Sequence, residues 1–386
     1  MLLKKPIRSF NRKDWLWVFL LALLMFAVFI IYNNSHFSIP GEQELTTKVQ
    51  VLDEMVLPGK FKSPYDFVFI NVGKDLELIK DEEGGDNVIT DRTKLGSFLK
   101  LLADSNRHQF LLCDIVFDMP SPEDSLFRED IRGLNRAVFP KHFGDSGIIP
   151  SIFPLPMFLA DYHSNTGKFS RFRLIYNDSD KTIPVAIHEQ LQGANYRNGW
   201  GTVLCNNRLC LRAISPKYYI RQYDLLESKR YPYFNLGELL ILQNEPSFYS
   251  KFLRNKFIVI GNFETDIHDT PVGKMPGSLI LLNTYLSLLN GNHQLSISWI
   301  VTMFLIFFLI SLYMVHGALE PAILIKKKGW WAGIANSLLV KVFSLVGLSF
   351  AISAISLFIF GVQCQVFSVV FFILVVNFLF NLSKPK

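Results

Sequence analysis

The chain has 386 residues, of which 50% are hydrophobic and 19% are charged, and its formal net charge is +6. Soluble domains usually carry about 25% charged residues, so the composition differs from that of an ordinary soluble protein. With only 4 cysteines and 8 histidines, the chain is also unlike a scaffold built on disulfides or on structural metal ions.

The first predicted element is a membrane-spanning helix from Trp15 to Tyr32, where no residue is charged and nearly all are apolar. A helix needs about 20 residues to cross the hydrocarbon core, with 17 as the lower limit. We expect an uncleaved signal anchor, because the apolar run is long for a signal peptide and no small-x-small cleavage site follows it.

The segment from Asn33 to Ser296 is predicted to form one α/β domain, with a mostly parallel sheet and helices on its faces. Three short apolar runs are typical of strands that are buried on both sides: Phe67 to Val72, Phe110 to Phe117 and Lys256 to Gly261. Asp91 is suited to cap a helix over Lys94 to Ala103, so the first two strands form a predicted right-handed βαβ unit with this helix.

The rest of the domain combines further helices with a hairpin. Helices are predicted at Asn235 to Gln243 and at Gly277 to Leu289, the second ending at Asn290-Gly291. Trp200 to Leu204 and Leu209 to Ile214 form a predicted hairpin across Asn206-Asn207. The segment from Phe139 to Tyr162 shows no pattern that assigns it to a helix or a strand.

Three more apolar runs predict membrane-spanning helices: Ile297 to Val315, Val342 to Phe360 and Val366 to Leu382. Together with the first span, they give four transmembrane α-helices, one N-terminal and three C-terminal. Only residues 361–365 join the last two spans, which predicts a tight antiparallel pair.

The charges predict the orientation of these spans. Residues 1–14, 316–341 and 383–386 hold 11 of the 39 basic residues and 2 of the 33 acidic ones, which leaves 28 basic and 31 acidic residues in 33–296. Lys and Arg concentrate on the cytoplasmic side of membranes. We therefore expect a multi-pass protein of a bacterial cytoplasmic (inner) membrane, with both termini cytoplasmic and residues 33–296 extracytoplasmic. The basic charge is thus a topology signal, and we expect no nucleic-acid partner.

Short motifs of the outer domain follow one another in a recognisable order. They are Phe67–Val72 with Asp91-Arg92, Asp114–Phe117 with Pro122-Glu123-Asp124, Leu209–Arg212, and a C-terminal block of Ile258–Gly261, Asp266, Thr270-Pro271, Met275–Gly277, Asn283 and Leu288–Gly291. In order and spacing they resemble the CHASE family of type two, the extracytoplasmic sensory domains associated with bacterial cyclases and histidine kinases. The resemblance implies a sensory domain that needs no cofactor and performs no chemistry.

Members of this family commonly continue into a cytoplasmic output domain, whereas only Ser383 to Lys386 follow the last predicted span. We therefore expect a receptor subunit that detects an extracytoplasmic ligand or an envelope state and signals to a separate cytoplasmic effector or membrane partner subunit. The alternative is a structural or docking subunit of a bacterial envelope complex. An enzyme is not expected, and the residues leave open whether the chain forms homo-oligomers.

The predicted ligand site lies at the carboxyl ends of the strands, where open α/β sheets bind their ligands. It is a crevice for a small molecule or peptide lined by Asn71, Asp114, Asp266 and Thr270. The competing interpretation is that these residues shape loops and cap helices. No metal ion is expected there, because Asp266, His268 and Asp269 lack a second ligand cluster at a familiar spacing.

Two further groups of residues have two interpretations each. Cys205 and Cys210 flank a four-residue loop, so they either form a disulfide in an oxidising compartment or pack as reduced thiols. The predicted cytoplasmic loop contains a basic and aromatic cluster: Lys326, Lys327, Lys328, Trp330 and Trp331. This cluster is typical of an anchor at the bilayer surface, and it is equally suited to dock a cytoplasmic partner.

Overall fold

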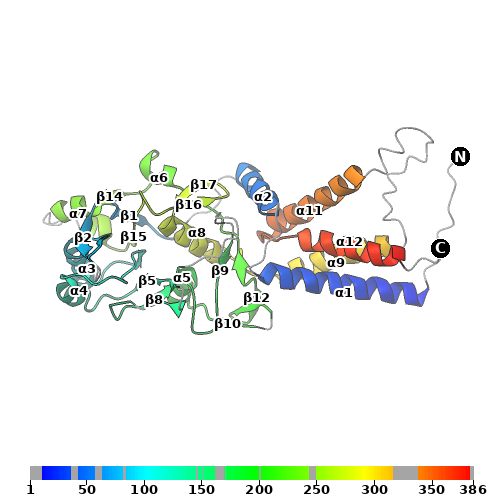
Figure 1. Ribbon diagram of the computed structural model, residues 1–386, viewed down its shortest axis with the longest axis horizontal. Helices are drawn as coiled ribbons and strands as arrows, with labels where there is room; N and C mark the ends of the chain where they lie inside the picture. Colours follow the sequence, from blue (N-terminus) through cyan, green and yellow to red (C-terminus); the bar gives the residue numbers. More distant parts are fainter. Residues whose placement is uncertain are drawn as a thin grey trace.

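The computed structural model describes residues 11–35, 42–56, 63–80, 84–144, 147–149, 151–160, 169, 171–199, 201–242, 249–315 and 338–382. The molecule is elongated, with an α/β domain at one end and a bundle of long helices at the other (Figure 1). The predicted anchor Lys326, Lys327, Lys328, Trp330 and Trp331 lies outside the described residues.

A six-stranded parallel sheet forms the centre of the described α/β domain. In spatial order its strands are β14 (Tyr233–Asn235), β1 (Phe67–Asn71), β15 (Phe257–Gly261), β4 (Phe110–Cys113), β5 (Ala137–Lys141) and β8 (Met157–Leu159). Every neighbouring pair is parallel, and the central strands align Phe67 with Phe257 and Phe257 with Phe110. The predicted α/β class and parallel sheet are confirmed.

Helices cover both faces of this sheet. One face packs against α3 (Arg92–Ser105), α4 (Asp124–Asp130) and α7 (Leu236–Leu242), and the other against α5 (Ile183–Gln192) and α8 (Gly277–Leu289). Alternate side chains of β1 enter the two cores, with Val68 and Ile70 on the α3 side and Phe67 and Phe69 on the α8 side. Burial on both faces explains why these strands are continuous apolar runs.

The two strands that α3 connects are parallel strands of the same sheet, with β15 between them. One bound of the predicted βαβ unit is wrong: the second strand ends at Cys113 rather than Phe117, because the chain leaves the sheet after Asp114 N donates a hydrogen bond to Ile260 O. The predicted cap of α3 is confirmed, since Asp91 accepts a hydrogen bond from Lys94 N at 2.9 Å.

Smaller hairpins surround the sheet. They are β2 (Leu76–Lys80) with β3 (Asp86–Thr90), β6 (Phe143–Gly144) with β7 (Gly147–Ile148), β9 (Phe172–Arg173) with β13 (Ala213–Ile214), β16 (Ile267–Thr270) with β17 (Gly273–Pro276), and the three strands β10 (Tyr196–Asn198), β11 (Val203–Cys205) and β12 (Arg208–Cys210). The predicted turn at Asn206 and Asn207 joins β11 to β12, and both residues have a positive φ. The remaining short helices are α2 (Glu42–Val56), α6 (Gln222–Leu226) and the π-helical segment η1 (Tyr249–Leu253).

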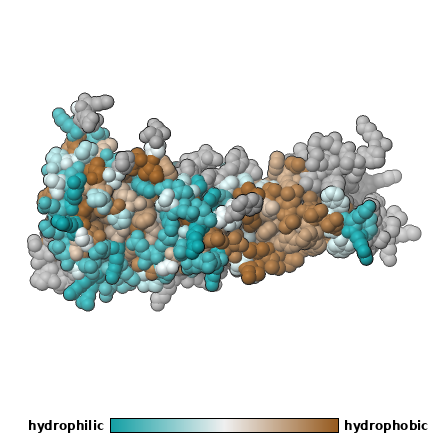
Figure 2. All heavy atoms as spheres, turned by 90° about the horizontal axis from the view of Figure 1, so that it is seen from below, coloured by the Kyte–Doolittle hydropathy of each residue, from teal (hydrophilic) through white to brown (hydrophobic). Residues whose placement is uncertain are grey.

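The helix bundle consists of α1 (Arg12–Asn34), α9 (Ile297–Val315), α11 (Leu338–Phe360) and α12 (Phe367–Leu382) in the described part of the chain. Phe29 of α1 stacks on Trp299 of α9, and these two helices are long and apolar enough to cross a membrane. The outward side chains of the bundle are also apolar, as the brown band in Figure 2 shows. An exposed apolar belt of this size is what a lipid-facing surface requires.

Candidate functional site

A crevice of about 690 Å³ opens at the carboxyl edge of the parallel sheet. Its lining includes residues that come directly after sheet strands: Val72 after β1, Asn262 after β15, Asp114 after β4 and His142 after β5. Small-molecule sites commonly measure about 300–1,000 Å³. The crevice therefore lies where the sheet predicts a ligand site and has a suitable size.

Two of the four predicted site residues meet in this crevice, at the start of α8. A β-carbon on Gly277 would overlap Asp266 Oδ2 and lie 3.3 Å from Asp114 Oδ2. Gly277 N also donates to Asp266 O at 3.0 Å. The absence of a side chain at Gly277 is therefore what allows both carboxylates to approach the first turn of α8.

Two histidines complete the charged part of the crevice. His268 Nε2 lies 2.9 Å from Asp266 Oδ1, and this contact, followed by the nearby Asp114, raises the pKa of His268. Burial, and then the charge of Asp266, raise the pKa of Asp114 to about 7, whereas His142 and His268 act in the opposite direction. Near neutral pH, the protonation of Asp114 thus responds to any charged group that enters the crevice.

The other two predicted residues, Asn71 and Thr270, form hydrogen bonds within the protein at this edge of the sheet. Asn71 is fully buried, donates to Asn235 Oδ1 and Glu264 Oε1 at 3.0 Å each, and accepts from the backbone of Gly73 and Phe263. Thr270 Oγ1 donates to Gly273 O and closes the turn between β16 and β17. Among the described residues, neither lines the crevice. For these two positions the structure supports the interpretation as loop-shaping residues.

The disulfide suggested for Cys205 and Cys210 is absent, because all four cysteines are free and buried. Cys205 pairs with Arg208, and Cys210 pairs with Val203, so the two cysteines are diagonal neighbours on the hairpin. Diagonal residues are about 7–8 Å apart, beyond the usual Cα separation in a disulfide. The structure thus has the alternative arrangement, two reduced thiols in the core.

Helix α8 connects the crevice to the helix bundle. Its 13 residues span about 20 Å, and those from Ser278 to Leu288 are all buried. After α8, residues 290–296 lead directly into α9, and two backbone bonds hold them to the β12 region: Leu211 N donates to His293 O, and Leu295 N donates to Leu209 O. A displacement of α8 in the crevice would therefore reach α9 through a short, hydrogen-bonded link.

A half-buried arginine forms a second connection between the two parts. Arg171 donates to Gln365 Oε1 at 2.7 Å, to Asn33 O at 2.5 Å and to Ala213 O at 3.1 Å. It thereby joins the α/β domain to the end of α1 and to the loop between α11 and α12. Burial lowers the pKa of Arg171 to about 10, so the side chain stays charged at neutral pH.

The chain matches no protein-family model, no curated protein and no solved structure. The resemblance to the CHASE family of type two therefore rests on the sequence motifs alone.

Proposed function

We propose that this protein is a sensory receptor subunit of a bacterial cytoplasmic membrane. Its α/β domain would lie outside the cytoplasm, bind a small ligand in the crevice or respond to an envelope state, and signal through four transmembrane helices to a cytoplasmic effector. The orientation rests on the 11 basic and 2 acidic residues of segments 1–14, 316–341 and 383–386. The helices α11 and α12 support the third and fourth spans, because each covers most of a predicted one.

The observation that carries this proposal is the position of α8. Its first residue, Gly277, lies against both carboxylates of the crevice, and its last turn is followed within a few residues by α9. A ligand that moves the start of α8 therefore acts on a helix that a short link joins to α9 of the bundle. A scaffold or docking subunit has no need of a crevice joined to a span in this way.

The lining of the crevice indicates the chemistry of its ligand. Apolar side chains such as Ile115, Met119 and Ile280 surround the carboxylates of Asp114 and Asp266. A primary or secondary amine would pair with the carboxylates, and an apolar body would cover the remaining lining. We therefore propose an amphiphilic amine as the ligand class.

The test uses the full-length protein in lipid nanodiscs, screened by thermal unfolding against a panel of amphiphilic amines. A fluorophore attached through Ser296→Cys reports movement of the link, since the native cysteines are buried. We expect binders to raise the Tm and to change the fluorescence, and Asp114→Asn to abolish both effects. Asp104→Asn, an exposed carboxylate on α3, is the control that should retain them. If no amine binds and only envelope-building proteins co-purify with the chain, the structural or docking subunit is the better assignment.

A further inference from the structure

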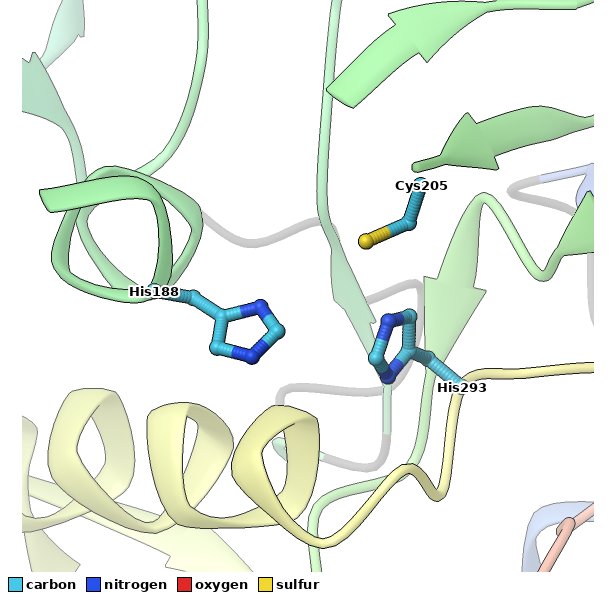
Figure 3. A group of neighbouring side chains, drawn as sticks. All are labelled: His188, Cys205 and His293. Atoms are coloured by element: carbon cyan, nitrogen blue, oxygen red, sulfur yellow. The ribbon is translucent and has the colours of Figure 1, made fainter. Parts of the chain in front are cut away.

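A second group of reactive side chains is buried far from the edge of the sheet that holds the crevice. His188 from α5, Cys205 from β11 and His293 from the link after α8 place one nitrogen or sulfur atom each within 4.8 Å of one another. Figure 3 shows the sulfur of Cys205 pointing toward the space between the two imidazole rings. The three residues are 7%, 2% and 0% exposed, respectively.

The surroundings supply a second sulfur and a fourth candidate ligand. Cys210 of β12 is fully buried and its thiol interacts with that of Cys205, but Cys210 is not among the three residues whose ligand atoms lie within 4.8 Å of one another, so it has further to move than they do. The hydroxyl of Tyr196 lies 2.7 Å from His188 Nδ1 and 2.9 Å from His293 Nε2. An ion bound by both histidines would therefore displace this hydroxyl from its position between the rings.

A hydrogen-bond network alone accounts poorly for this group. Tyr196 satisfies one nitrogen of each histidine, but His293 Nδ1 is buried without a hydrogen-bond partner. Thiols form only weak hydrogen bonds, so Cys205 and Cys210 compensate little for burying the imidazoles. Helix α5, the β11–β12 hairpin and the link after α8 converge on groups whose shared property is that they bind soft or borderline metal ions.

The dimensions fit such an ion after a small contraction. In a tetrahedral zinc site, bonds of about 2.0 Å to nitrogen and 2.3 Å to sulfur place the ligand atoms roughly 3.3–3.8 Å apart. The ligand atoms of His188, Cys205 and His293 lie within 4.8 Å, so each needs to move by less than about 1 Å. Two imidazoles and two thiolates form a ligand set that is common in structural zinc sites.

We propose that His188, Cys205, Cys210 and His293 form a binding site for one Zn²⁺ ion at the base of the α/β domain. The ion would join α5, the β11–β12 hairpin and residues 290–296, immediately before α9 begins. Both thiols lose a proton on binding, and the two protons pass to solvent, so no redox step is involved. The proposal rests on these contacts and does not depend on the crevice or its ligand.

The test is metal binding by the reduced, full-length protein after treatment with a chelator. We expect one equivalent of Zn²⁺ in competition with a chromophoric chelator, and with Co²⁺ we expect the visible bands and near-ultraviolet charge-transfer band of a tetrahedral thiolate site. Loss of a residue that only supports a metal ligand weakens metal binding by roughly 10- to 100-fold. Cys205→Ser and His293→Gln each remove a ligand, so each should weaken Zn²⁺ binding by more than this.

Two controls separate this site from other side chains. Cys364→Ser removes a buried thiol elsewhere in the chain, and His108→Gln removes a buried histidine outside both sites. Both variants should bind Zn²⁺ as the unsubstituted protein does. Circular dichroism checks folding, and His188→Gln replaces any variant that fails it. Binding of less than half an equivalent, or binding retained in folded Cys205→Ser and His293→Gln, would overturn the proposal. The redox state in the cell is checked by quenching cells with acid and alkylating the free thiols directly. A Cys205–Cys210 disulfide found in this way would overturn the proposed zinc site as well.

Discussion

Replacing Asp114 with Asn should stabilise the protein at alkaline pH and have little effect at acidic pH. The carboxylate is partly buried at the start of α8, and burial together with Asp266 raises its pKa from 3.8 to about 7. Between these values the folded protein holds a proton that the unfolded chain has released, so stability falls as the pH rises from about 4 to 7. At 1.36 kcal/mol per pH unit, the full cost of the ionised carboxylate is up to about 4 kcal/mol.

Asn keeps the shape of the side chain and removes the charge. We therefore expect Asp114→Asn to unfold at a Tm higher by up to about 8 °C at pH 8, because 1 kcal/mol corresponds to about 2 °C in a domain of this size. The assay is thermal unfolding followed by tryptophan fluorescence at pH 4, 6 and 8, in one detergent throughout. His142 and His268 also act on Asp114, but they are present in both proteins, so the difference between the two proteins reports on the Asp114 carboxylate.

Two outcomes would refute this account of Asp114. One is a variant that is no more stable than the unsubstituted protein at pH 8, and the other is a stabilisation of equal size at pH 4 and pH 8. Asp104→Asn, which removes an exposed carboxylate, should leave the pH profile unchanged.

Two further substitutions test the start of α8 in the crevice and the contacts that join the α/β domain to the bundle. Gly277→Ala should destabilise the protein by about 1–3 kcal/mol in chemical denaturation, because the added methyl group overlaps Asp266 Oδ2. Gly347→Ala is the control and should not destabilise it, because a methyl group there meets open space in α11. Equal losses of stability in the two variants would contradict the overlap at Gly277. Arg171→Ala should lower stability by at least about 1–3 kcal/mol in the same assay, because it leaves buried oxygens of Asn33 and Ala213 without a donor. Arg132→Ala, at an exposed site, is the control for Arg171→Ala. If Arg171→Ala loses no more stability than this control, Arg171 does not stabilise the contact between the α/β domain and the bundle.

The elements of the fold were predictable wherever the signal is local. The helix at Gly277 to Leu289 has the predicted limits, and the first and third strands differ from prediction by only one residue at an end. Each is an apolar segment bounded by polar or turn-forming residues. The position of β15 between β1 and β4 was not predictable in this way, because it depends on pairing between segments that are far apart in the sequence.

The same limit applies to the sites. Asp114 follows a recognisable strand, so its place at the edge of the sheet was predictable, whereas His142 follows β5, which the sequence does not reveal. Pro140 lies within β5, and proline in a strand between two neighbours argues against that assignment. Cys205 and Cys210 suggested a disulfide because the sequence gives their separation but not the diagonal register of the hairpin. His188 and His293 carry no local signal, since only the tertiary fold brings them together.

The two sites lie at opposite ends of α8, and this arrangement has a thermodynamic consequence. Asp114 contacts the start of the helix, His293 follows its end, and Asn283 fixes its middle by bonds to the backbone of Ile220. If α8 moves as a rigid unit, a change at one end alters the free energy of binding at the other, and the effect is reciprocal. The factor by which Zn²⁺ changes the proton affinity of Asp114 must then equal the factor by which ionisation of Asp114 changes Zn²⁺ affinity. Measuring Zn²⁺ affinity at pH 8 for the unsubstituted protein and Asp114→Asn tests this directly: equal affinities would show that α8 does not couple the two ends.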